Sequence, residues 1–205
     1  MTTDTTRRKV LAVLVGGIVL GIGAAVTLAA WNDSEFAKGT FTAGSFDLEG
    51  ATNGANGTYT DHVDAAGAAT LSFTTPLAGN MSPTDVVYAP FWVRLDSATT
   101  NDATLVASSA SGEDTTGANT AQLSYTVYAI APGATCDATA SGGTLVASGA
   151  NLDAFTAGSS VALTAGAGTD PGTPVQLCFA VTAAAGLEQG HETTATWSFT
   201  ATSAP

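Results

Sequence analysis

Positive charge, histidine and aromatic side chains are all scarce in this sequence, and the shortage of positive charge excludes the first class of function. Lysine and arginine number 5 against 17 aspartates and glutamates, so the formal net charge is −12. Three of the five cations are Arg7, Arg8 and Lys9, which leaves only Lys38 and Arg94 for the rest of the chain. Nucleic acids and anionic lipids are bound by clustered cations that release counterions. We therefore expect no nucleic-acid partner and no membrane-surface function.

Catalytic and cofactor motifs are also missing. His62 and His191 lie far apart in the chain, and neither belongs to an H-E-x-x-H pattern that places two zinc ligands on one helical face. The sequence has no G-x-S-x-G nucleophile motif, no phosphate-binding loop and no dinucleotide fingerprint. Acidic turns such as Asp61–Asp64 lack the ligand spacing of an EF-hand, so solvated surface acids are favoured over a calcium site. We expect no enzyme activity, no metal ion and no cofactor.

The amino terminus has the layout of an export signal. Residues 5–31 read TTRRKVLAVLVGGIVLGIGAAVTLAAW, a basic start followed by an apolar run and then small residues. The apolar run is long enough to span a bilayer as a helix, so a retained membrane anchor is the alternative. Glycines within the run and the small pair Ala29–Ala30 favour cleavage, while the paired arginines leave the twin-arginine route open. We predict a signal peptide over residues 1–30 and one secreted domain over residues 31–205.

Beyond the leader, hydrophobic residues alternate with polar ones, which is typical of strands with one buried face. Intervals rich in glycine and acidic residues, Ser111–Gly117 and Ala165–Gly172, are expected to be turns. About eight strands at this spacing predict an all-β fold, a two-sheet antiparallel sandwich that is jelly-roll-like and preceded by an N-terminal signal helix. The predicted inward-facing rows lie in residues 71–73, 91–95, 122–130, 174–183 and 194–202.

The two cysteines predict one disulfide bond. Cys136 lies in a loop that follows Pro132, and Cys178 lies on a predicted strand, on the face opposite Leu177 and Phe179. In an oxidising compartment such a pair forms a bond, which would tie the loop to the outer face of a sheet. A reactive or metal-binding thiol would need histidine or further ligands nearby, and the sequence shows no such cluster.

Two stretches resemble one known family. Residues 28–35, LAAWNDSE, and residues 39–48, GTFTAGSFDL, are similar to the start of the TasA and camelysin family, exported proteins that the signal peptidase SipW processes. A looser match covers residues 83–105, around YAPFWVRL. The resemblance therefore covers the export region and part of the strand framework. It implies cleavage between Ala30 and Trp31, with the signal peptidase as a partner during export.

The resemblance also implies self-association. In TasA-like proteins the exposed N-terminal segment can add as a strand to the sheet of the next subunit, and the matching residues here are Thr40, Phe41, Phe46 and Leu48. Phe41 and Phe46 would face opposite sides of a regular strand, so Gly44 is a candidate bulge. The alternative, expected for the free monomer, is that this strand pairs within its own domain.

These observations predict a secreted structural protein of the cell surface or extracellular matrix, a fibre or biofilm-matrix subunit that assembles by N-terminal strand addition. A monomeric adhesin or ligand-binding sandwich of the same fold is the first alternative. A secreted protease of the camelysin type is the second, and the missing zinc pattern disfavours it.

Overall fold

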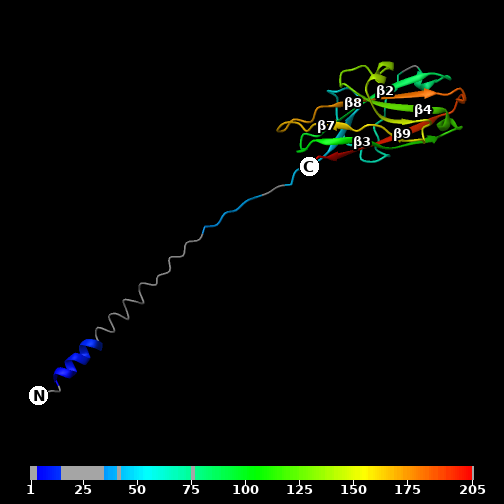
Figure 1. Ribbon diagram of the computed structural model, residues 1–205. Helices are drawn as coiled ribbons and strands as arrows, with labels where there is room; N and C mark the ends of the chain where they lie inside the picture. The colour runs from blue at the N-terminus through cyan, green and yellow to red at the C-terminus, as the bar shows by residue number, and fades with distance from the viewer. Residues whose placement is uncertain (1–3, 15–34, 41–42, 75–76, 205) are drawn as a thin grey trace. The chain divides into compact units, whose positions relative to one another are not determined.

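The computed structural model of this 205-residue chain describes residues 4–14, 35–40, 43–74 and 77–204. Its contacts divide it into two units, Met1–Thr42 and Ala43–Pro205. In the first unit, residues 4–14 form the expected N-terminal helix (Figure 1). No helix in the described part of the chain combines the length and the apolar character needed to cross a membrane. The predicted cleavage site, Ala30 and Trp31, lies outside the described residues.

The second unit is a sandwich of two antiparallel sheets, which confirms the predicted fold class (Figure 1). The larger sheet has six strands, and β8 and β4 lie at its middle. In spatial order these strands are β1 (Leu48–Ala51), β2 (Val86–Leu95), β8 (Val175–Ala183), β4 (Leu123–Ile130), β5 (Thr144–Gly149) and β6 (Thr156–Ala157). The smaller sheet has the order β7 (Val161–Leu163), β3 (Ala103–Asp114) and β9 (Thr193–Ser203). Short 3-10 turns are η1 (Leu77–Gly79), η2 (Asn119–Gln122) and η3 (Ala138–Gly142).

Strand β8 shows why the larger sheet forms. Its alternate residues Leu177, Phe179 and Val181 are buried in the core, as the hydrophobic alternation predicts. Phe179 lies opposite Ala89 of β2 on one side and opposite Val127 of β4 on the other. Because β8 is paired on both edges and buried on its inner face, it is the centre of the fold.

Aromatic side chains of β9 hold the smaller sheet against the larger one. The ring of Trp197 lies 5.0 Å from that of Phe179 and 5.5 Å from that of Tyr125, measured between centroids. The ring of Phe199 meets Phe179 edge-on at 5.9 Å. These tilted and edge-on arrangements are the ones that the aromatic quadrupole favours. The inward row predicted for residues 194–202 is therefore confirmed.

Three local predictions differ from the structure. Ser111–Asp114 belong to β3, where a turn was expected, because they pair with Thr196–Thr193 of β9. Residues 71–73 form no strand, although Leu71 and Phe73 do pack against the core. The strand expected over residues 40–48 begins only at Leu48, so Gly44 lies ahead of the strand and is not a bulge within it. The turn predicted at Ala165–Gly172 is confirmed as a loop.

Candidate functional site

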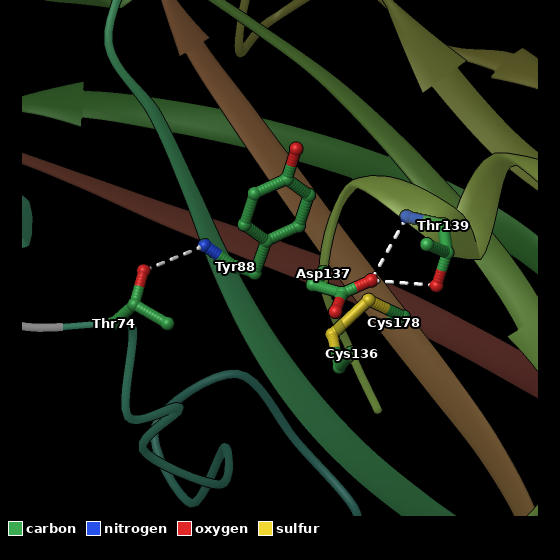
Figure 2. The surroundings of a disulfide bond; sticks show 6 residues. All are labelled: Thr74, Tyr88, Cys136, Asp137, Thr139 and Cys178. Carbon is green, nitrogen blue, oxygen red and sulfur yellow. Dashed lines mark hydrogen bonds between the residues drawn. A yellow bond between two sulfur atoms is a disulfide. The ribbon is translucent and has the colours of Figure 1, made fainter. Parts of the chain in front are cut away.

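The predicted disulfide is present and joins Cys136 to Cys178, with 5.3 Å between the Cα atoms (Figure 2). Cys178 lies on the outer face of β8, opposite Pro90 of β2 and Tyr128 of β4. It is nonetheless fully buried. A loop is thus fastened over the middle of the larger sheet, and the bond is a structural staple.

The loop behind Cys136 is shaped by its own hydrogen bonds. The carboxylate of Asp137 accepts hydrogen bonds from the backbone N–H of Thr139 at 2.8 Å and from its hydroxyl at 2.6 Å (Figure 2). These bonds cap η3 and lower the pKa of Asp137. The indole N–H of Trp92 donates to the carbonyl of Pro132 at 2.9 Å. Trp92 and the disulfide therefore hold this loop against the sheet at two points.

The N-terminal segment enters the second unit through a short anchor. Ser45 forms an isolated parallel bridge with Thr99, and its hydroxyl donates to the carbonyl of Ala98. The hydroxyl of Thr99 accepts from the backbone N–H of Asp47 at 2.9 Å and donates to its carbonyl at 3.1 Å. β1 follows at once and pairs with β2. The segment therefore pairs within its own domain from Ser45 onward, which agrees with the expectation only for the end of the stretch Thr40–Leu48.

The predicted assembly residues that the structure describes lie apart from this anchor or at its margin. Thr40 is exposed and belongs to no strand, and residues 35–40 are all exposed. Phe41 lies outside the described residues. Phe46 is 41% exposed, while Leu48 is partly buried as the first residue of β1. Of the three described residues, Thr40, Phe46 and Leu48, only Leu48 belongs to a strand.

Arg94, the arginine of the second unit, contacts both Glu49 and Tyr59. The guanidinium Nε of Arg94 donates to the carboxylate of Glu49 at 2.6 Å, and the guanidinium lies 3.8 Å from the ring centroid of Tyr59. Burial raises the pKa of Tyr59, which Arg94 partly offsets. Sequence reasoning missed this cluster because its members are far apart in the chain. It fixes β1 on β2, since Glu49 and Arg94 face each other across the two strands.

The smaller sheet ends in an unusual edge strand. β9 is 11 residues long and pairs with β3 alone, so its second edge has no neighbouring strand in the described part of the molecule. The other outermost strands, β1, β6 and β7, have only 4, 2 and 3 residues. Unpaired strand edges are where sheets accept a further strand. The outward-facing residues of β9 all carry hydroxyl groups, namely Thr194, Thr196, Ser198, Thr200 and Thr202.

The two histidines occupy different places. The ring of His62 meets that of Phe91 edge-on, with 6.2 Å between centroids. His191 lies in a turn, where its Nε2 is 3.8 Å from a carboxylate oxygen of Glu188. Among the described residues, no group of three or more histidine, cysteine, aspartate or glutamate side chains is placed to hold a metal ion.

Comparison with known proteins adds no relative: neither a protein-family model nor a curated protein matches this chain. The resemblance to the TasA and camelysin family therefore stays a prediction from short stretches of sequence.

Proposed function

We propose that this chain is an exported structural protein of the cell surface or extracellular matrix, which assembles into fibres through its N-terminal segment. The observation that carries the proposal is an exposed segment without strand partners, residues 35–40, in a chain whose smaller sheet has a long unpaired edge. An extended segment of one copy can complete the backbone hydrogen bonds at such an edge of the next. A contact between two different surfaces can repeat from copy to copy, and it yields a fibre when the repeated rotation does not close into a ring.

Two further features agree with an extracellular structural role. A disulfide bond persists in an oxidising compartment, and here it fastens a loop over the outer face of the larger sheet, with Cys178 fully buried. The acidic surface keeps single copies soluble before they assemble. The resemblance at residues 28–48 adds processing by a signal peptidase, which would expose the N-terminal segment only after export.

The decisive experiment compares three forms of the secreted chain by electron microscopy: residues 31–205, residues 43–205, and residues 31–205 carrying Thr40→Pro. Proline removes a backbone donor and interrupts an added strand, while Thr40→Val keeps the donor and serves as the matched control. Thr40 is exposed in the monomer, so neither substitution disturbs the fold. We expect fibres from the intact chain and from Thr40→Val only.

Fibres that persist without residues 31–42 would refute assembly through the N-terminal segment. An intact chain that stays monomeric under all conditions would instead favour the alternative of a monomeric adhesin or ligand-binding sandwich. Circular dichroism and thermal unfolding of each form check that loss of fibres does not follow from loss of the fold.

A further inference from the structure

The sequence of β9 is nearly the same read in either direction. It reads TTATWSFTATS, and Ser198 is its midpoint. Residues at equal distances from Ser198 belong to the same chemical class, small with small, aromatic with aromatic and hydroxylic with hydroxylic. The pairs are Trp197 with Phe199, Thr196 with Thr200, Ala195 with Ala201, Thr194 with Thr202, and Thr193 with Ser203.

This symmetry matters because of where the strand lies. Pairing of a strand with a second copy of itself in antiparallel direction, about a two-fold axis, places each residue opposite its mirror-related position. On β9 that arrangement brings threonine opposite threonine and tryptophan opposite phenylalanine, which are pairs that stabilise antiparallel sheets. A strand in the middle of a sheet could not use such symmetry, but β9 is an edge.

The edge is also accessible to hydrogen bonding. In the described part of the chain, the backbone of residues 193–203 is hydrogen-bonded to no segment other than β3. Phe73 reaches Trp197 from the segment that precedes β2, with 6.5 Å between the ring centroids. That contact joins two rings, and no backbone hydrogen bond between the described residues occupies the outer side of β9.

The distribution of charged residues also favours β9 as the place where two copies meet. Of the 17 acidic and 5 basic residues, 14 acids and one base, Arg94, lie in the second unit, Ala43–Pro205. Two such units repel each other over most of their surface. β9 carries no charged residue and no proline, the two features that most often protect an edge strand from pairing. It is therefore a long strip along which two copies can approach without bringing like charges into contact.

We infer that β9 is a self-association site, at which two copies of this chain pair edge to edge about a two-fold axis through Ser198. The smaller sheets of the two copies then form one continuous sheet. Trp197 of each copy lies opposite Phe199 of the other, and the hydroxyl row of each copy continues into that of its neighbour. This inference does not rest on the proposed fibre function, because it needs no N-terminal segment. Both use the outer edge of β9, so a copy that is paired in this way cannot accept an N-terminal segment at that edge.

Cysteine cross-linking tests both the pairing and its register. Directly opposed residues of an antiparallel pair have Cα atoms about 4.5–5.5 Å apart, within the range of roughly 4.4–6.8 Å that a disulfide spans. Ser198→Cys should therefore form a covalent dimer under mild oxidation, seen on a non-reducing gel of residues 43–205. Ser108→Cys is the matched control, because Ser108 is exposed on the same face but one strand further from the edge.

The register has its own control. Thr194→Cys or Thr202→Cys alone should cross-link poorly, whereas the double variant should cross-link as readily as Ser198→Cys. Equal cross-linking of Ser108→Cys and Ser198→Cys would overturn the inference, and so would single threonine variants that react as fast as the pair.

A reversible measurement complements the cross-link. The hydroxyl of Ser108 donates to that of Ser198 at 3.0 Å, so Ser108→Asp and Ser198→Asp lose the same hydrogen bond and add the same charge. Only Ser198→Asp places two carboxylates opposite each other at the axis. In sedimentation equilibrium we expect at least a tenfold weaker dimer for Ser198→Asp than for Ser108→Asp. Added salt should strengthen the wild-type dimer because it screens the repulsion. A wild-type unit that remains monomeric at high protein and salt concentration would overturn the inference.

Discussion

The two sheets of the sandwich differ in where their long strands lie. The larger sheet has its long strands in the middle, only short strands at its edges, and a disulfide on its outer face. The smaller sheet has one of its two long strands, β9, at an edge. The inner side of β9 packs against the larger sheet through aromatic rings, and its outer side carries a row of hydroxyl groups. We infer from this difference that the larger sheet carries most of the stability, and we place the proposed association at the edge of the smaller sheet.

The largest expected effect comes from the aromatic core that joins the sheets. Phe179 of β8 is 1% exposed, whereas Phe199 of β9 is only partly buried. Phe179→Ala should lower the free energy of unfolding by about 3–5 kcal/mol, and Phe199→Ala should cost about 1–2 kcal/mol less. Urea denaturation of both variants gives the comparison. Equal losses would mean that the two sheets contribute equally to stability.

The second effect concerns the staple of the larger sheet. Cys136 and Cys178 are 42 positions apart, and closing a loop of this length stabilises a fold by about 2–4 kcal/mol. Reduction of the folded protein should lower its free energy of unfolding by that amount. The double variant Cys136→Ala with Cys178→Ala is the control, since a reductant should not change its unfolding. An unchanged urea midpoint after complete reduction would contradict the assignment of a stabilising role.

The third effect is confined to the short edge of the larger sheet. Arg94→Met removes the ion pair with Glu49, whose side chain is only 12% exposed, and the contact with Tyr59. We expect a loss of about 1–2 kcal/mol in the free energy of unfolding. Hydrogen exchange should accelerate at the amide of Gly50, which donates to the carbonyl of Thr60. Arg94→Lys keeps the charge and should lie between wild type and Arg94→Met.

The smallest effects are changes in the pH dependence of stability, which differ in sign between Asp114 of the smaller sheet and Asp47 beside the larger sheet. Asp114, at the end of β3, accepts a hydrogen bond from the hydroxyl of Thr193, which lowers its pKa. The carboxylate therefore stabilises the fold above the unfolded pKa of about 3.9, and this contribution is lost as the pH falls through the lower, folded value. Asp114→Asn should be less stable than wild type at pH 7, and the difference should vanish under strongly acidic conditions.

Asp47, just ahead of β1, should behave in the opposite way. Desolvation and the nearby charge of Asp61 raise its pKa, so its ionised form disfavours the fold. Stability from this residue is present below its unfolded pKa and is lost as the pH rises through the raised, folded value. Asp47→Asn should therefore be slightly more stable than wild type at pH 7 and no different at pH 3, as thermal unfolding at both values would show.

Much of the sandwich could be predicted because its long strands alternate strictly. β4, β8 and β9 follow the expected bounds within a residue or two, since apolar residues recur at every second position along each of them. The stretch Ser111–Asp114 was predicted wrongly because serine, glycine and acidic residues favour turns. Pairing with β9 outweighs that local preference. The strand predicted at Leu71 and Phe73 is wrong for a related reason. Hydrophobic side chains can pack on a core although their backbone pairs with no strand.

The candidate site was only partly predictable. The disulfide could be inferred from the face on which Cys178 lies, but not the complete burial of Cys178, which depends on where the loop around Pro132 folds. The cluster of Arg94, Glu49 and Tyr59 depends on contacts between segments distant in sequence. The symmetry of β9 is visible in the sequence, yet its importance appears only when the strand is known to be an edge.

The disulfide has a mechanical consequence for any assembly under tension. A chain pulled from its two ends lengthens by about 3.3–3.6 Å for each residue that is unravelled. Because Cys136 and Cys178 are joined, the segment between these residues, which lie 42 positions apart, cannot be drawn out, and this withholds roughly 140 Å of contour length. Each oxidised subunit is therefore shorter at full extension than its reduced form. A network made from such oxidised subunits reaches its maximum length after a smaller extension.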